Sequence, residues 1–323
     1  MVGGEMISVI MPAYNSDKFV NDAIESVLSQ TYPHFELIVC DDGSTDKTLE
    51  IVESYAKRDQ RIRLLRNKFR SVSINANSGV FAARYPWIAR LDADDMATPD
   101  RLELQIQAAE REPHVVCWGG AAQLINRDGR KLRTARLGPE TEAEFEELRR
   151  SGEVIYILGL TTMIRRDAFL QVGGYDPRFN SADDIELLSR LADIGSIRAL
   201  QAILGYYRIY GNSFTASRSI IQERLFRFIE ARNKARLAGG NLELEAYLEA
   251  LDRQPLPVRL HEALSGRSRQ YYHHSRIGFA EHRVAQALGW GMLALLADPI
   301  STARRLQRKA QTARRRRSLH GVI

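Results

Sequence analysis

The sequence predicts an α/β protein with a mostly parallel, mixed sheet that is covered by helices on both faces, followed by a helical C-terminal extension. Two observations lead to this prediction. Short apolar runs alternate with segments of helical periodicity in the first part of the chain, which is typical of a parallel sheet. The alternation stops near residue 217, and helical periodicity alone continues. We therefore expect an α/β domain over residues 1–216 and a helical region over residues 217–323.

The expected strands are short apolar runs bounded by proline, acidic or turn residues. They cover residues 6–11, 37–40, 62–65, 88–91, 115–118, 160–164 and 202–207. Apolar residues at helical spacing predict helices in other segments: 17–28, 48–55, 101–109, 140–150, 221–237, 242–251 and 263–297. Pro255 and Pro257 indicate a linker between the last two.

Composition favours a soluble globular protein. The chain has 323 residues, of which 44% are hydrophobic and 27% charged, enough for one large domain with an extension or for two domains. Its two cysteines, Cys40 and Cys117, lie in strand-like runs and are interpreted as reduced core thiols of a cytoplasmic protein. The longest apolar stretch, residues 284–297, is interrupted by Gln286 and is shorter than the ~20 residues a spanning helix needs.

The basic excess is concentrated at the end of the chain. Residues 304–317 carry eight lysines and arginines and no acid, in a chain of net charge +6. With the apolar residues before it, this tail can bind an anionic membrane surface, which would place the protein peripherally at the inner face of the membrane. The alternative is a docked helix with a solvated basic end. A nucleic-acid-binding function would also explain the tail, but the first half concentrates acids instead, so no nucleic acid is expected.

Three carboxylates lie directly after the apolar run at residues 88–91. Asp92, Asp94 and Asp95 repel one another unless a cation lies between them, and Mg²⁺ or Mn²⁺ prefers such oxygen ligands. Alternation along an extended chain places Asp92 and Asp94 on the same side. We expect this pair to hold a divalent metal. A solvated acidic turn is the alternative, and Asp95 can instead cap the next element of the chain.

Several polar loops are expected to meet at one edge of the sheet. Tyr14 follows the first strand, Asp42 the second and Asp92 the fourth, and the carboxyl ends of parallel strands share an edge. The glycine-rich dinucleotide fingerprint and the phosphate-binding loop ending in Lys-Ser/Thr are both absent. Acids and a metal at this edge suit a mononucleotide better.

Ordered motifs carry a resemblance to a known family. Residues 7–15 (ISVIMPAYN), 39–46 (VCDDGSTD) and 89–95 (ARLDADD) resemble the three signatures of family 2 glycosyltransferases with the GT-A fold. The likeness continues through GGYD at 173–176, SADDIEL at 181–187 and YRIYGNS at 207–213. It implies a nucleotide-sugar-binding half over residues 1–118 and an acceptor half over residues 119–216.

The resemblance also implies roles for individual residues of the first half. Pro12, Ala13 and Tyr14 would line the nucleotide pocket, with Tyr14 against the base, and Asp42 would hydrogen-bond the base or ribose. Asp92 would contact the ribose or the metal, and Asp94 would be the main metal ligand. A buried phenol for Tyr14 and a turn carboxylate for Asp42 are the structural alternatives.

In the second half, the resemblance maps the general base onto Asp184, with Asp183 at the variable position before it. A carboxylate at a helix start is also a capping device, so the two roles can coexist. Asp183, Tyr175 and Arg208 are candidates for acceptor or phosphate contacts. Arg208 can equally form a salt bridge with an acid.

Together these motifs imply a metal-dependent, inverting transfer of a sugar from a nucleoside diphosphate, with a UDP-sugar as the expected donor, to a hydroxyl acceptor. The expected acceptor is a saccharide or lipid-linked saccharide in cell-surface polysaccharide or glycolipid synthesis. A catalytically silent nucleotide-sugar-binding protein is the alternative. Residues 67–79 depart from the family pattern, because the expected loop glycine and the arginine before Asn75 or Asn77 are missing.

Overall fold

The computed structural model describes residues 5–210, 219–281, 283–300 and 302. They divide into two compact units. The first takes in the chain up to Arg208 together with Leu225–Asn241, and the second takes in the described residues of Ile209–Arg224 and of the segment from Leu242 onward. Residue 216, the predicted boundary, lies outside the described residues. Helix α9 (Ser219–Leu237) contributes residues to both units.

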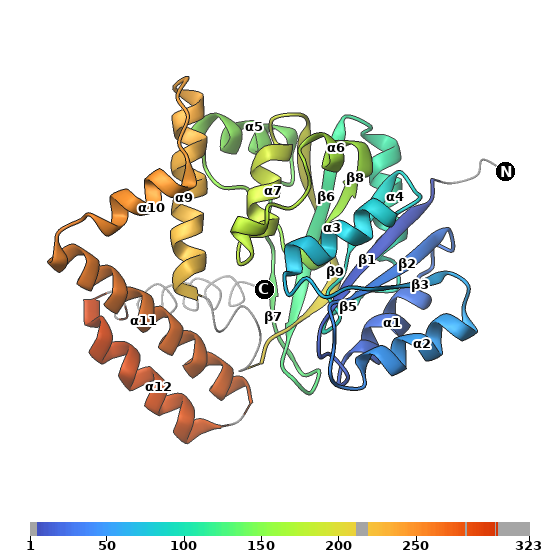
Figure 1. Ribbon diagram of the computed structural model, residues 1–323, viewed down its shortest axis with the longest axis horizontal. Helices are drawn as coiled ribbons and strands as arrows, with labels where there is room; N and C mark the ends of the chain where they lie inside the picture. Colours follow the sequence, from blue (N-terminus) through green and yellow to red (C-terminus); the bar gives the residue numbers. More distant parts are fainter. Residues whose placement is uncertain (1–4, 211–218, 282, 301, 303–323) are drawn as a thin grey trace, which may run out of the picture. The chain divides into compact units, whose positions relative to one another are not determined.

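The first unit is built on a mixed sheet (Figure 1). Its described strands are β1 (Ile7–Ala13), β2 (Phe35–Asp41), β3 (Ile62–Arg66), β4 (Trp87–Arg90), β5 (Met96–Ala97), β6 (Val115–Ile125), β7 (Lys131–Ala135), β8 (Met163–Arg165) and β9 (Ser196–Arg208). The strand order is β3-β2-β1-β4-β8-β6-β9-β5, with β7 beside β6. Strands β1 to β4 run parallel, β8 is antiparallel between β4 and β6, and β9 runs parallel to β6. The predicted mixed, mostly parallel sheet is confirmed.

Helices connect these strands. In the first unit they are α1 (Val20–Leu28), α2 (Thr48–Arg58), α3 (Val72–Ala82), α4 (Arg101–Arg111), α5 (Glu142–Ser151), α6 (Arg166–Gln171) and α7 (Asp183–Leu191), with the 3₁₀ turns η1 (Gly159–Thr161) and η2 (Pro177–Phe179). Alternate side chains of a strand face opposite sides, so Ile10 and Cys40 pack with Val80 of α3 in one core cluster. Gly79 allows this close approach, because a Cβ there would lie 2.6 Å from Ile10 Cγ2 and 2.7 Å from Cys40 Sγ.

Three details differ from the sequence prediction. The strand expected over residues 160–164 is wrong in its first half, where η1 precedes a strand that begins at Met163. Helices α3 and α6 and strands β5 and β7 were not predicted. The linker expected at Pro255 and Pro257 is shorter than predicted. It covers residues 253–255 and so includes Pro255, but α11 (Leu256–Ala280) accommodates Pro257 in its first turn, where no intrahelical N–H is needed.

The second unit contains α10 (Leu244–Asp252), α11 and α12 (Val284–Ala297). Helices α11 and α12 pack side by side (Figure 1). The Ser275 hydroxyl of α11 donates to the Ala287 carbonyl of α12 over 2.7 Å, and the Tyr271 and Trp290 rings stack with centroids 5.5 Å apart. The basic tail at 304–317 lies outside the described residues.

Candidate active site

The carboxyl ends of β1, β2 and β4 meet at one edge of the sheet, as their parallel pairing requires. The Asp42 backbone N–H donates to the Ala13 carbonyl over 2.9 Å, which joins the loops that follow β1 and β2. Pro12 and Ala13 are buried within β1, whereas the Tyr14 side chain is 58% exposed. The alternative of a buried phenol for Tyr14 is therefore wrong, and a contact between its ring and a base stays a prediction.

Asp42 organises the segment that departs from the family pattern. Its Oδ1 accepts hydrogen bonds from the backbone N–H groups of Phe69 (2.6 Å) and Arg70 (3.0 Å), and its Oδ2 from that of Ser71 (3.0 Å). Arg70 adopts a φ of +53°, a conformation uncommon outside glycine. The buried carboxylate thus holds a loop without the expected glycine, and a contact from Asp42 to a base or ribose stays a prediction.

Asp92 and Asp94 are half-buried in the turn after β4, where the Asp95 N–H donates to the Asp92 carbonyl over 3.1 Å. Two oxygen-bearing side chains at this edge fit Mg²⁺ or Mn²⁺, which proteins commonly bind through one or two carboxylates together with substrate phosphates. Among the residues that the structure describes, no three His, Cys, Asp or Glu side chains gather around one point as metal ligands would.

Asp95 is 1% exposed, and its contacts are structural. Its Oδ1 accepts a hydrogen bond from the Arg208 backbone N–H over 2.8 Å, which attaches the end of β9 to the acidic turn. Burial, together with the charges of Asp94 and Asp92, raises the pKa of Asp95 well above its ordinary value. The next element after Asp95 is the strand β5 and not a helix, and the Asp95 carboxylate bonds to Arg208 instead of capping it.

Arg208 was predicted either to contact a phosphate or to form a salt bridge with an acid, and in the structure it forms the salt bridge. Its guanidinium lies 3.4 Å from Asp22, donates to the backbone carbonyls of Asp94 (2.9 Å) and Arg127 (2.8 Å), and covers the Phe19 ring. The side chain is almost fully buried. These contacts direct the arginine to the support of the acidic turn rather than to an open phosphate site.

Asp183 and Asp184 begin α7, as the motif predicts. Asp183 accepts a hydrogen bond from Arg90 over 3.2 Å, and Asp184 accepts one from the N–H of Ile185 over 2.8 Å. Burial and the charge of Asp183 raise the pKa of Asp184, Arg90 opposes both, and together they bring it to about 7. A carboxyl that titrates near neutral pH suits a general base.

Gly159 of η1 lies beside this group. A Cβ at Gly159 would stand 3.6 Å from Asp184 Oδ2 and 3.8 Å from Arg90 Cδ, so this backbone turn lies directly against both side chains. Tyr175 is 5% exposed, and the centroid of its ring lies 5.2 Å from the Arg90 guanidinium carbon. Burial raises the pKa of Tyr175 to about 12. An acceptor contact from Tyr175 stays a prediction, since the structure shows its ring buried against Arg90.

The sequence interpretation gave no role to Arg90, Ser73 or Asn180, and the structure links all three to the acids of α7. Ser73 Oγ donates to Asn180 Oδ1 over 3.1 Å and lies 3.5 Å from Asp183 Oδ2. The sequence did contain a sign that Arg90 has a special role, because it is a charged residue at the end of an otherwise apolar strand. Ser73 and Asn180 carried no such signal.

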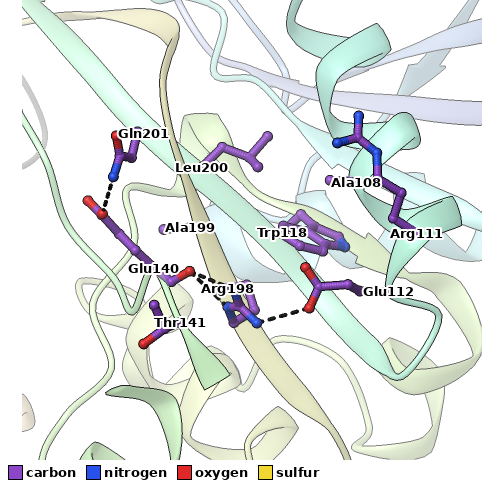
Figure 2. A pocket seen from close by; sticks show the side chains of 10 residues that line it. All are labelled: Ala108, Arg111, Glu112, Trp118, Glu140, Thr141, Arg198, Ala199, Leu200 and Gln201. Carbon is purple, nitrogen blue, oxygen red and sulfur yellow. Dashed lines mark hydrogen bonds and ion pairs between the residues drawn. The ribbon is translucent and has the colours of Figure 1, made fainter. Parts of the chain in front are cut away.

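A cavity of about 290 Å³ lies away from the acids, near the amino ends of β6 and β9 (Figure 2). Arg198 spans it, donating to Glu112 over 3.0 Å and to the Glu140 carbonyl over 2.6 Å. Trp118 lies beside this guanidinium. The amino ends of β6 and β9 lie at the sheet edge opposite to the carboxyl ends of β1, β2 and β4. The cavity is therefore no part of the candidate active site.

Sequence relatives support the same interpretation. The Glycosyl transferase family 2 model matches residues 8–173. A Bacillus subtilis protein named as a glycosyltransferase, EpsE, is 35% identical over 199 residues, which are 60% of this chain and 69% of that one. TuaG of the same organism, named as a teichuronic acid biosynthesis glycosyltransferase, is 30% identical over 66% of this chain and 82% of its own. An uncharacterized glycosyltransferase of Haemophilus influenzae is 37% identical over 37% of this chain, which spans only 38% of that relative.

Solved structures show the same fold. S. aureus TarS 1–349 in complex with UDP-GlcNAc superposes with a TM-score of 0.55 at 15% identity, covering 88% of this chain and 89% of that one. The Pyrobaculum calidifontis mannosyltransferase PcManGT, in complex with GDP-Man and Mn²⁺, gives 0.53 at 16% identity over 97% and 81%. The GT-A fold predicted from the sequence is confirmed. With the ordered motifs and the matching family model, this chain belongs to glycosyl transferase family 2.

Proposed function

We propose that this enzyme is a metal-dependent, inverting glycosyltransferase that moves a sugar from a nucleoside diphosphate, with a UDP-sugar as the expected donor, to a hydroxyl of a saccharide or lipid-linked saccharide. One observation carries the proposal. Arg90 contacts Asp92 at the nucleotide edge and Asp183 at the start of α7, next to Asp184. Donor-side and acceptor-side acids therefore share one group of contacts, as a direct transfer between two substrates requires.

We assign a separate role in the reaction to each of these side chains. Asp92 and Asp94 would hold Mn²⁺ or Mg²⁺, which when bound stabilises the charge that develops on the departing diphosphate. Asp184 would accept the proton of the acceptor hydroxyl as its oxygen attacks the anomeric carbon. A single displacement of this kind inverts the anomeric configuration and needs no second catalytic carboxylate. Tyr14, exposed at the same edge, would lie against the base.

The names of similar proteins support the choice of substrates. A nucleotide sugar is bound in the TarS and PcManGT structures, and TuaG is named for teichuronic acid biosynthesis. Cell-surface polysaccharide or glycolipid synthesis is therefore the setting we propose. A panel of UDP-, GDP- and dTDP-sugars with Mn²⁺, scored by thermal shift and then by nucleoside diphosphate release, tests the donor. Stabilisation without release on any acceptor would favour the silent binding protein instead.

The pKa of Asp184 predicts the pH dependence of turnover. A base must be unprotonated, so kcat is expected to fall as the pH drops below about 7. The groups facing Asp184 are Asp183 and Asp92, which raise its pKa, and Arg90, which lowers it. The charge of Asp184 in turn raises the pKa of Tyr156. Asp183→Asn should therefore move the acid limb of the kcat profile to lower pH. A limb that stays in place, or moves upward, contradicts Asp184 as the titrating base.

We also propose that the second unit binds the surface of an anionic membrane. In α12 and just beyond it, large apolar side chains are exposed at every fourth position: Leu288, Met292, Leu296 and Ile300. Leu288, Met292 and Leu296 share one face of α12, which carries no charged residue, and Ile300 lies beyond the end of that helix. The arginine-rich sequence at 304–317 would add attraction for anionic headgroups, at about 1 kcal/mol for each cation. Among the described helices, none is both long and apolar enough to cross a bilayer.

Vesicle flotation tests this surface. The full chain should float with vesicles containing phosphatidylglycerol and less with pure phosphatidylcholine, because both apolar and charged contacts contribute. Met292→Glu with Leu296→Glu, and separately truncation after Asp298, should each reduce flotation. Phe81→Glu, on an exposed apolar residue of α3, serves as the control and should float like the unaltered chain. Equal flotation of all variants would contradict the proposed surface.

A further inference from the structure

Arg90 is the last residue of β4, and its backbone is fixed on both sides. Its N–H donates to the Thr162 carbonyl over 3.1 Å, and its own carbonyl accepts a hydrogen bond from the buried guanidinium of Arg101 over 2.9 Å. Arg101 also donates to the Thr162 carbonyl over 3.0 Å. The side chain of Arg90 therefore starts from a rigid point between β4 and the segment that precedes β8.

From this point the Arg90 guanidinium reaches acids from distant parts of the sequence. Nε donates to Asp92 Oδ1 over 3.0 Å, and Nη1 donates to Asp183 Oδ2 over 3.2 Å. The guanidinium lies over the Tyr175 ring, and the residue is only 7% exposed. A planar guanidinium directs its donors in fixed directions, so two simultaneous bonds also fix the relative orientation of the two carboxylates.

The carboxylates belong to opposite sides of the reaction. Asp92 lies in the turn of the proposed metal site, and Asp183 is the first residue of the helix that carries Asp184. The Ser73 hydroxyl also supports Asp183, but its distance of 3.5 Å makes it a weak hydrogen bond. Of these two contacts, the bond from Arg90 is therefore the stronger restraint on the Asp183 carboxylate.

We propose that Arg90 is a positioning residue for the transfer step, which holds the nucleotide-side turn and the first turn of α7 in the relative placement that the reaction needs. This inference rests on the proposed function. It assigns to Arg90 no contact with the donor or acceptor. Its effect passes through Asp92 and Asp183, so it should appear in the step that uses both sides rather than in the binding of nucleotide alone.

The test is Arg90→Gln, examined in the full chain with the donor and acceptor that the unaltered enzyme uses. We expect kcat for transfer to fall about 100-fold, the effect typical of displacing a catalytic group by about 1 Å, with the donor KM changed less than about threefold. Calorimetric binding of UDP with Mn²⁺ should also change little. Arg90→Lys keeps the charge but loses the planar fork, so it should recover part of the lost turnover.

Two further variants separate positioning from stability and charge. Arg198→Gln removes a largely buried arginine that pairs with Glu112 beside the distant cavity (Figure 2), and it should lower Tm without changing kcat. Arg90→Gln leaves Asp92 and Asp183 without their arginine, and adding Asp183→Asn removes the more buried of these two charges, which protects folding. Recovery of turnover in this double variant, equal loss of UDP binding and transfer in Arg90→Gln, or unchanged kcat would each overturn the proposal.

The outcome can be told apart from failure of the proposed function. If the unaltered chain bound UDP but released no nucleoside diphosphate from any donor, the transferase proposal itself would be lost. If it turned over normally and Arg90→Gln did so too, only the role of Arg90 would be lost.

Discussion

Replacing Asp184 with asparagine is expected to lower kcat for sugar transfer by about 10²- to 10⁴-fold, the range typical of a general base. The amide keeps the size of the side chain but cannot take up the proton of the acceptor hydroxyl. Donor KM and UDP affinity should stay close to those of the unaltered enzyme, because the proposed nucleotide contacts lie on β1, β2 and the turn after β4. Steady-state kinetics with nucleoside diphosphate release measures both.

Asp167→Asn is the matched control for the capping role of Asp184. Asp167 also lies in the first turn of a helix, α6, and its carboxylate accepts a hydrogen bond from the next N–H, of Ala168, over 2.7 Å. Asp167→Asn should lower stability by up to about 1 kcal/mol, because Arg165 and the Ala168 N–H hold the pKa of Asp167 below its ordinary value. Asp184→Asn should cost less stability, because it also removes a buried carboxylate whose pKa is raised. If Asp184→Asn affected only Tm, as Asp167→Asn should, then Asp184 would be a cap and not the base.

Asp94→Asn is expected to reduce turnover about a thousandfold and to weaken the Mn²⁺-dependent part of UDP binding. Metal stabilisation of the leaving diphosphate supplies several kcal/mol, and each 1.36 kcal/mol is about tenfold in rate. A chelator should likewise abolish turnover of the unaltered enzyme, and added Mn²⁺ or Mg²⁺ should restore it. Calorimetry of UDP binding with and without Mn²⁺ provides a measurement independent of catalysis.

Asp100→Asn provides the control for the metal ligand, because Asp100 is exposed just before α4 and makes no side-chain capping bond. It should leave turnover and the Mn²⁺ effect on UDP binding unchanged. Turnover that survives both chelation and Asp94→Asn would rule out the proposed metal dependence. It would leave the membership of the family intact, since that depends on the sequence and the fold.

The convergence of Tyr14, Asp42 and Asp92 was predictable because it follows from a local rule. Each residue lies at the end of an apolar run, and parallel strands bring their ends to one edge whatever packs around them. The position of Asp184 at a helix start was predictable for a similar reason. Carboxylates at the first turn and apolar residues at helical spacing specify that element from within a few residues of sequence.

The partners of these residues were not predictable in the same way. Asp42 was interpreted as a ligand for a base or ribose, and its bonds to the N–H groups of residues 69–71 depend on a loop of unusual sequence. Arg208 had two alternatives, and the choice of Asp22 came from packing β9 against the acidic turn. Such contacts join segments far apart in the chain, for which local periodicity holds no information.

The sequence by itself determined the α/β class, the order of the motifs and the edge at which they meet, because hydrophobic periodicity and strand polarity are local properties. Only the tertiary structure decided which buried charges compensate one another. Asp92 and Asp183 lie far apart in the chain, and the single guanidinium between them becomes visible only after the strand and the helix have packed. Burial requires such pairing, since a charge removed from water is costly unless a partner lies within hydrogen-bonding distance.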